Sequence, residues 1–112
     1  MPTIETILSR AKALNIHITE YEFTPTKQNP APDPPFIVYM IPEKQSGSDE
    51  KNRIRDISAS IELYTDRKPD PVLESRIENE VLFDQEFSKN VAPIPNENMY
   101  QAAYDFEIIQ KK

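Results

Sequence analysis

Residues 53–64, Arg-Ile-Arg-Asp-Ile-Ser-Ala-Ser-Ile-Glu-Leu-Tyr, decide the fold of this chain. Apolar and polar side chains alternate there, with the apolar set Ile57, Ala59, Ile61 and Leu63 and the polar set Ser58, Ser60, Glu62 and Tyr64. A period of two is typical of a strand with one buried face. We therefore predict a half-buried strand over residues 53–64.

The neighbouring segment supplies a partner for this strand. Residues 36–41, Phe-Ile-Val-Tyr-Met-Ile, are continuously apolar and lie between prolines, which is typical of a short buried strand. The polar residues 42–52, with Ser-Gly-Ser at their centre, separate the two strands. We expect an antiparallel hairpin whose tip, residues 42–52, is a flexible arm.

Two amphipathic helices are expected. Over residues 2–14, apolar side chains recur every three or four positions, at Ile4, Ile7, Leu8, Ala11 and Leu14. Asn15 suits the helix exit. A second helix begins at Pro71, where Asp70 caps the first turn, and extends to about Phe83.

Three further segments have strand character. Residues 16–23 contain two alternating sets that are out of phase, which predicts a bulge or kink near Thr19 and Glu20. Residues 87–94 predict a strand with Phe87 and Val91 inward, which Pro93 and Pro95 either end or place at a sheet edge. Residues 99–109 alternate between apolar and polar side chains and predict the last strand.

The order of these elements predicts the fold class. We expect one α+β domain over residues 1–112, with an antiparallel four- to five-stranded sheet and two helices packed on one face. Residues 24–35, which are rich in proline, are expected to form an extended loop.

Composition excludes several classes of function. The net charge is −6 and the lysines and arginines are scattered, which disfavours direct nucleic-acid binding. Cysteine is absent and Gly47 is the only glycine, so zinc fingers, thiolate catalysis and glycine-rich phosphate loops are excluded. We expect no cofactor and no metal.

Catalysis is also disfavoured. His17 is the only histidine, and no nucleophile motif accompanies it, so we expect a non-enzymatic protein. A hydrolase remains as an alternative that would need a deep pocket with His17 and converging carboxylates. The amphipathic N-terminal residues resemble neither a signal peptide nor a membrane span, so we expect synthesis in the cytoplasm and no membrane association.

Several stretches, in order, carry a family resemblance. After the N-terminal helix and residues 16–23 come Pro-Pro-Phe-Ile-Val-Tyr at 34–39, Ile-Glu-Leu-Tyr-Thr-Asp at 61–66, the acidic helix at 74–82, Glu-Asn-Met-Tyr at 97–100 and Ala-Tyr-Asp-Phe-Glu at 103–107. Over nearly its whole length the chain resembles the small tail-terminator, or tail-completion, proteins of long-tailed phages and prophages.

The resemblance implies a structural virion protein. Such proteins form a ring, usually hexameric, that caps the tail tube and joins it to the head, so tail-tube and head-connector proteins are the implied partners. On this interpretation, sheet edges and the arm contact neighbouring subunits. The candidate interface residues are Glu43, Lys44, Ser46, Gly47, Ser48, Asp49, Arg53, Arg55 and Asp56.

Two alternatives to the tail terminator remain. Another head–tail connector or minor capsid protein would differ in ring symmetry and in the protein that it binds. A monomeric adaptor domain that binds a cellular protein would form a one-to-one complex and no ring.

Overall fold

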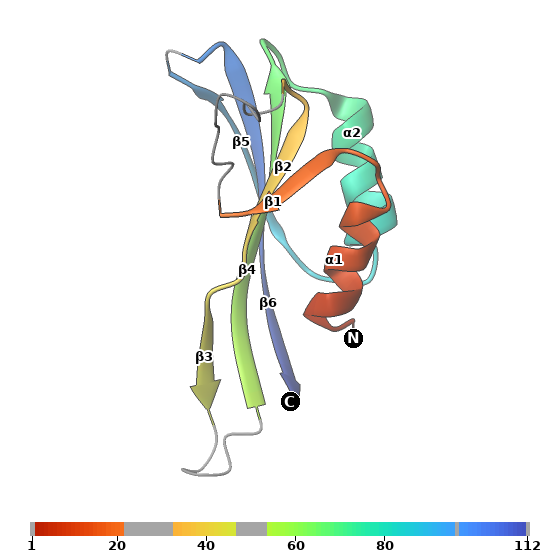
Figure 1. The fold of residues 1–112 in the computed structure, drawn as a ribbon, viewed down its shortest axis with the longest axis vertical. Helices are drawn as coiled ribbons and strands as arrows, with labels where there is room; N and C mark the ends of the chain where they lie inside the picture. Colours follow the sequence, from red (N-terminus) through yellow and green to blue (C-terminus); the bar gives the residue numbers. More distant parts are fainter. Residues whose placement is uncertain (1, 22–32, 47–53, 96, 112) are drawn as a thin grey trace, which may run out of the picture.

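The computed structural model describes residues 2–21, 33–46, 54–95 and 97–111, and they form a β-sheet with helices on one face (Figure 1). The elements are α1 (Ile4–Lys12), β1 (His17–Glu20), β2 (Phe36–Met40), β3 (Glu43–Ser46), β4 (Ile54–Asp66), α2 (Pro71–Arg76), η2 (Ile77–Val81), β5 (Ser88–Ile94) and β6 (Met99–Lys111). The strands follow the order β1-β2-β4-β6-β5, and β3 pairs with β4. The α+β class is confirmed.

The two longest strands form the centre of the sheet. β4 and β6 have 13 residues each and pair antiparallel from Ile54 opposite Lys111 to Asp66 opposite Met99. The alternation predicted for residues 53–64 is confirmed, because its apolar residues are buried and face the helices. Both strands extend further than β1, β2 and β5 at one end, where β3 joins them to make a three-stranded projection (Figure 1).

β2 and β3 behave as one strand interrupted at Pro42. Met40 lies opposite Ser60 and Glu43 lies opposite Ile57, so the register against β4 continues unbroken across the interruption. The Pro42 carbonyl still accepts a hydrogen bond from the Ser58 amide at 3.0 Å, but proline has no N–H to return. The expected hairpin is confirmed. The expected flexible arm begins as strand β3, and residues 47–52 lie outside the described residues.

One strand pairing corrects the expected sheet. β1 runs parallel to β2, with His17 beside Phe36 and Glu20 beside Tyr39, whereas the other four pairings of the described strands are antiparallel. A parallel pair requires a connection of about a dozen residues or more, and residues 21–35 are long enough to provide it. The sheet is therefore mixed, and a wholly antiparallel sheet is wrong.

The expected bulge in residues 16–23 takes a different form. β1 ends at Glu20, and Tyr21 adopts a left-handed backbone with φ of 66°. The Tyr21 amide nevertheless donates to the Tyr39 carbonyl at 2.8 Å. A left-handed backbone is incompatible with a regular strand, so β1 ends before Tyr21. Residues 22 and 23 lie outside the described part of the chain.

The helical layer is built from local signals. Thr3 caps α1 by accepting from the Thr6 amide at 3.2 Å, and Asn15, with φ of 61°, follows the helix end as expected. Asp70 accepts from the amides of Val72 and Leu73 at 3.1 Å each and starts α2. The core beneath these helices consists of Ile4, Ile7, Ala11, Leu14, Ile37, Ile57, Ala59, Ile61, Leu63, Ile77, Val81, Leu82, Ala102, Tyr104, Phe106 and Ile108.

The second helix ends differently from the expectation. After Arg76 it continues as the π-helical segment η2 and stops at Val81, two residues before Phe83. The Leu82 amide donates to the Ile77 carbonyl at 2.9 Å, which is the five-residue spacing of a π turn. The wider turn allows Val81 and Leu82, adjacent in sequence, both to be buried.

β5 is an edge strand, as predicted, but one of its inward residues is not buried. Phe87 packs edge-on against Tyr104, with ring centroids 5.3 Å apart. Val91 lies on the inward side, as expected, but it is 39% exposed and therefore not buried. The helical layer leaves this part of β5 uncovered, although Val91 lies on the helix-facing side of the sheet, opposite Ala102.

A polar cluster fastens the second helix to the sheet. Lys89 on β5 forms ion pairs with Glu74 at 2.8 Å and Glu78 at 2.7 Å, and the buried Tyr104 hydroxyl donates to Glu78 at 2.8 Å. The hydrogen bond from Lys89 holds the pKa of Glu78 below its ordinary value, and burial raises the pKa of Tyr104. The Tyr104 hydroxyl therefore remains a donor at neutral pH.

We predict that Tyr104→Phe lowers the free energy of unfolding by about 1–2 kcal/mol, because Glu78 loses a hydrogen bond at a partly buried site. Urea denaturation measures this change. Tyr100→Phe on the same strand is the control, since the Tyr100 hydroxyl makes no hydrogen bond with the described part of the chain. Equal effects of the two substitutions would show that the cluster contributes nothing.

Candidate interaction surface

No helix or strand of the described residues covers the sheet face opposite the helices (Figure 1). Its side chains alternate with the core residues along each strand. Apolar, small and acidic groups share it. Those from the central strands and β2 are Phe36, Val38, Met40, Ile54, Asp56, Ser58, Ser60, Glu62, Tyr64, Asp66, Met99, Gln101, Ala103, Asp105, Glu107, Ile109 and Lys111. We call this surface the open face.

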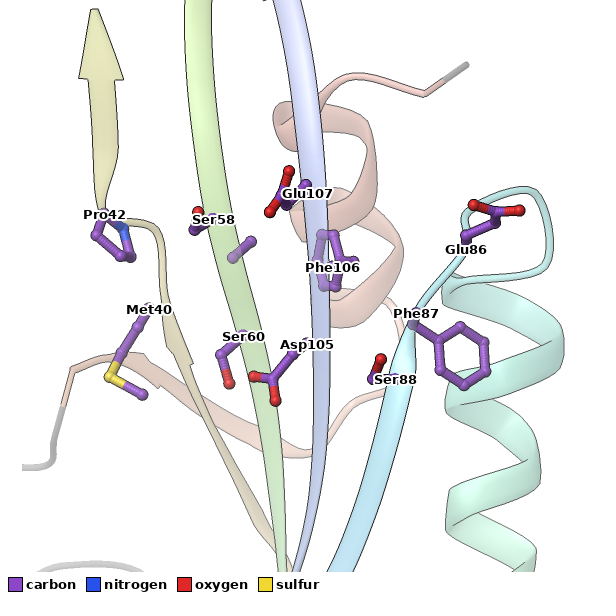
Figure 2. Close-up of a pocket in the computed structure, with 11 residues that line it drawn as sticks. Met40, Pro42, Ser58, Ser60, Glu86, Phe87, Ser88, Asp105, Phe106 and Glu107 are labelled. Carbon is purple, nitrogen blue, oxygen red and sulfur yellow. The ribbon is translucent and has the colours of Figure 1, made fainter.

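A groove of about 710 Å³ crosses the middle of the open face. Ser58 and Ser60 form part of its floor because their side chains are small, and Met40 and Pro42 rise on one side (Figure 2). Asp105 and Glu107 on β6 add two carboxylates, and the segment Glu86–Ser88 closes the far side. A concave surface lined by carboxylates and three serine hydroxyls favours a cationic or hydrogen-bonding partner over a nucleic acid.

The groove does not contain His17, which the hydrolase alternative requires beside converging carboxylates. Asp105 lies directly opposite Ser60, but the histidine of this chain, His17, pairs with Phe36, whose partner on β4 is Tyr64. At about 3.3 Å per residue, the row of His17 is roughly 13 Å from Ser60 along the strands. Among the described residues, no group of three or more histidine, aspartate or glutamate side chains is placed to hold a metal ion.

An aromatic pair lies beside the groove on the open face. The rings of Phe36 and Tyr64 stack with centroids 5.0 Å apart and planes inclined by 21°. The Tyr64 hydroxyl donates to Glu62 at 3.0 Å and accepts from the side-chain amide of Gln101 at 2.9 Å. Burial raises the pKa of Tyr64, so this hydroxyl stays protonated at neutral pH. The pair is a rigid amphipathic surface of the type that is enriched in protein interfaces.

The three-stranded projection is anchored to α1 on its helix-facing side. Arg55 forms an ion pair with Glu5 at 2.9 Å. Gln110, beside Arg55 on β6, accepts from the Ile4 amide at 2.9 Å and donates to Glu5 at 3.1 Å. These bonds satisfy a free amide of the first helical turn and fix the projection against the helix. From here on, the arm means β3 with residues 54–57 and 108–111, in place of the arm expected at residues 42–52.

The structure describes only some of the residues proposed for the interface. Gly47, Ser48, Asp49 and Arg53 lie outside the described residues. Glu43, Lys44 and Ser46 belong to β3, at the outer side of β4. Asp56 is on the open face of the arm opposite Ile109. Arg55 points to the other face, where its ion pair with Glu5 commits it to a contact within the chain.

Sequence reasoning missed the residues that position the arm. Gln110 and Glu5 are separated by 105 positions, and no local pattern links them. It also missed Gln85, which is buried and donates to the carbonyls of Glu86 and Glu107 at 3.0 and 3.1 Å. An isolated glutamine at an element boundary gives no periodic signal. Such contacts follow from the strand register and not from local sequence.

No known protein-family model matches this chain, and no curated protein matches it. The described part of the chain contains no helix that is long and apolar enough to cross a membrane.

The Glu5 anchor predicts a pH dependence of stability. The hydrogen bond from Arg55, and after it that from Gln110, lowers the pKa of Glu5. A carboxyl group with a lower pKa in the folded state stabilises the fold above its unfolded pKa of about 4.3, and this contribution is lost as the pH falls through the folded pKa. Glu5→Gln should therefore cost stability near neutral pH and little at strongly acidic pH.

The measurement is urea denaturation of both proteins between about pH 7 and about pH 3. Glu97→Gln is the matched control, because Glu97 is an exposed carboxylate in the turn between β5 and β6. A difference between wild type and Glu5→Gln that stays constant over this range would contradict the anchoring role of the Glu5 carboxylate.

Proposed function

We propose that this chain is a structural subunit of a phage or prophage tail, namely a tail terminator. It assembles as a ring on the tail tube, usually of six subunits in the proteins that it resembles, and joins the tube to the head. The proposal includes a non-enzymatic role, a place in the virion, and tail-tube and head-connector proteins as partners. It rests on the resemblance in the ordered sequence stretches given above and on one structural observation, the arm.

The shape of the arm supports a role in assembly, because its projecting end contributes little to the packing of a single chain. It extends past the helical layer, so its far end buries little of the hydrophobic core (Figure 1). Ile54 and Ile109 are exposed on its open face at 36% and 65%. A projecting strand layer with exposed backbone edges and isolated apolar side chains is suited to contact with another protein chain.

The anchoring of the arm also supports this role. The Arg55–Glu5 ion pair and the two hydrogen bonds of Gln110 hold the arm at a fixed angle to α1. A pre-organised contact element loses less conformational entropy on binding than a loose one. The groove and the Phe36–Tyr64 pair provide a second surface on the same face, where a neighbouring subunit or the tail tube would bind.

Deletion of residues 46–49 tests the proposal. We expect the deletion variant to keep its fold, measured by circular dichroism, and to lose the ring, measured by light scattering over a wide concentration range and by negative-stain electron microscopy. Where the ring closes only on a tail tube, the same variant should fail to bind purified tubes that the wild-type protein binds.

Glu97→Ala is the matched control, because Glu97 lies in the turn at the opposite end of the sheet from the arm (Figure 1). Normal assembly of the deletion variant would contradict the role of the arm. A one-to-one complex with a cellular protein and no ring would favour the adaptor alternative, and a ring that binds a portal or capsid protein and no tube would favour another connector.

A further inference from the structure

Part of β6 is a strand edge with no described strand beside it. β5 pairs with β6 only as far as Asp105, whereas β6 continues to Lys111. The Glu107 carbonyl accepts from the Gln85 side chain at 3.1 Å, and beyond that point no described element pairs with this side of β6. We call residues 107–111 the free edge.

The ladder shows which backbone groups the free edge presents. The Ser58 amide donates to Pro42, so even-numbered residues of β4 bond towards β3 and odd-numbered ones towards β6. The odd-numbered residues of β4 lie opposite even-numbered residues of β6. The odd-numbered residues Glu107, Ile109 and Lys111 therefore turn their N–H and C=O groups outward, away from β4.

The other described outer edges carry features that discourage strand addition. β1 and β3 have only four residues each. On β5 the residues that turn outward include Pro93, opposite Tyr100, and proline offers no N–H to a further strand. The free edge contains no proline and lies at the end of a 13-residue strand, so it is the edge best able to accept another strand.

The side chains of the free edge are complementary to themselves. Glu107, Ile109 and Lys111 all lie on the open face, all are exposed, and Ile109 is 65% exposed. An acidic, an apolar and a basic residue thus follow one another at a spacing of two. When such a strand pairs antiparallel with a second copy about its central residue, each acidic residue faces a basic one and the apolar residues face each other.

We propose that the free edge binds the free edge of a second copy of this chain. The two edges pair antiparallel about a two-fold axis that lies midway between the two copies of Ile109. Glu107 then lies opposite Lys111 of the second copy, and Ile109 opposite its equivalent. Ile109 exchanges both backbone hydrogen bonds across the axis, and the Glu107 carbonyl can accept from both Gln85 and the Lys111 amide of the second copy, since it has two lone pairs.

This contact continues the sheet from one copy to the next. An axis perpendicular to the sheet keeps both open faces on one side and both helical layers on the other. The contact involves residues 108–111 of the arm, but it can be tested apart from the proposed function, because deletion of residues 46–49 leaves the free edge in place. If both contacts form, the two-fold contact doubles the number of subunits in the assembly that the ring contact produces.

Charge reversal and its rescue test the proposal on the full chain. Glu107→Lys and Lys111→Glu each place like charges opposite each other, twice per interface because of the two-fold axis. We expect each to halve the molar mass in sedimentation equilibrium and to weaken association by roughly tenfold or more. The double variant Glu107→Lys with Lys111→Glu restores opposite charges and should recover the wild-type mass.

The control substitution is Val72→Glu, which adds a charge at a residue that is 70% exposed on α2. It should leave the mass unchanged. Hydrogen exchange gives a second readout, in which the Ile109 amide becomes more protected as protein concentration rises. The amide of Val91, which turns outward on β5, should not respond.

Three results would overturn the proposal. One is a monomer at every concentration with no concentration dependence at Ile109. Another is a mass that neither single charge reversal changes. The third is a double variant that is folded but as dissociated as the single variants. Loss of the ring on deletion of residues 46–49 bears on the proposed function alone, so the two proposals can fail separately.

Discussion

The ladder between β4 and β6 is the constraint on which the rest of the structure depends. Its 13 paired positions hold one register from Ile54 to Asp66, and that register decides which side chains meet the helices. A shift of this register by one residue would turn Ile57 and Leu63 to solvent and Ser58 to the core. The helices could then no longer cover the apolar side chains. β2, β3 and β5 pair with these two strands, β1 joins the sheet through β2, and both helices pack on the same face. The arm exists because β4 and β6 are longer than β1, β2 and β5.

The features that sequence predicted correctly are those with a local cause. The alternation from Ile57 to Leu63 records a single half-buried face, and Asp70 before Pro71 satisfies helix amides within the same turn. The direction of β1 had no local cause, because it depends on the path of residues 21–35. The π turn at Leu82 and the exposure of Val91 also depend on packing against distant elements, which a periodic pattern does not encode.

The candidate surface was harder to predict than the fold for the same reason. The arm at residues 42–52 was expected from its composition, but its strand β3 was not, and neither was the anchor at Glu5. Arg55 illustrates the difficulty, because a charged residue near a loop was expected to face a partner chain. Its position in the strand register turns it instead towards α1. Strand phase and not composition decides which charges are available to another molecule.

The unbroken register across Pro42 has a consequence for how related chains can differ in length. One residue added between β2 and β3 would turn every later side chain of β3 to the opposite face. Residues added in pairs to β4 and β6, with matching growth of β3, would keep both faces and extend the arm by about 7 Å at each step. The length of the arm can therefore change only in steps of two residues if both faces of its strands are to be kept.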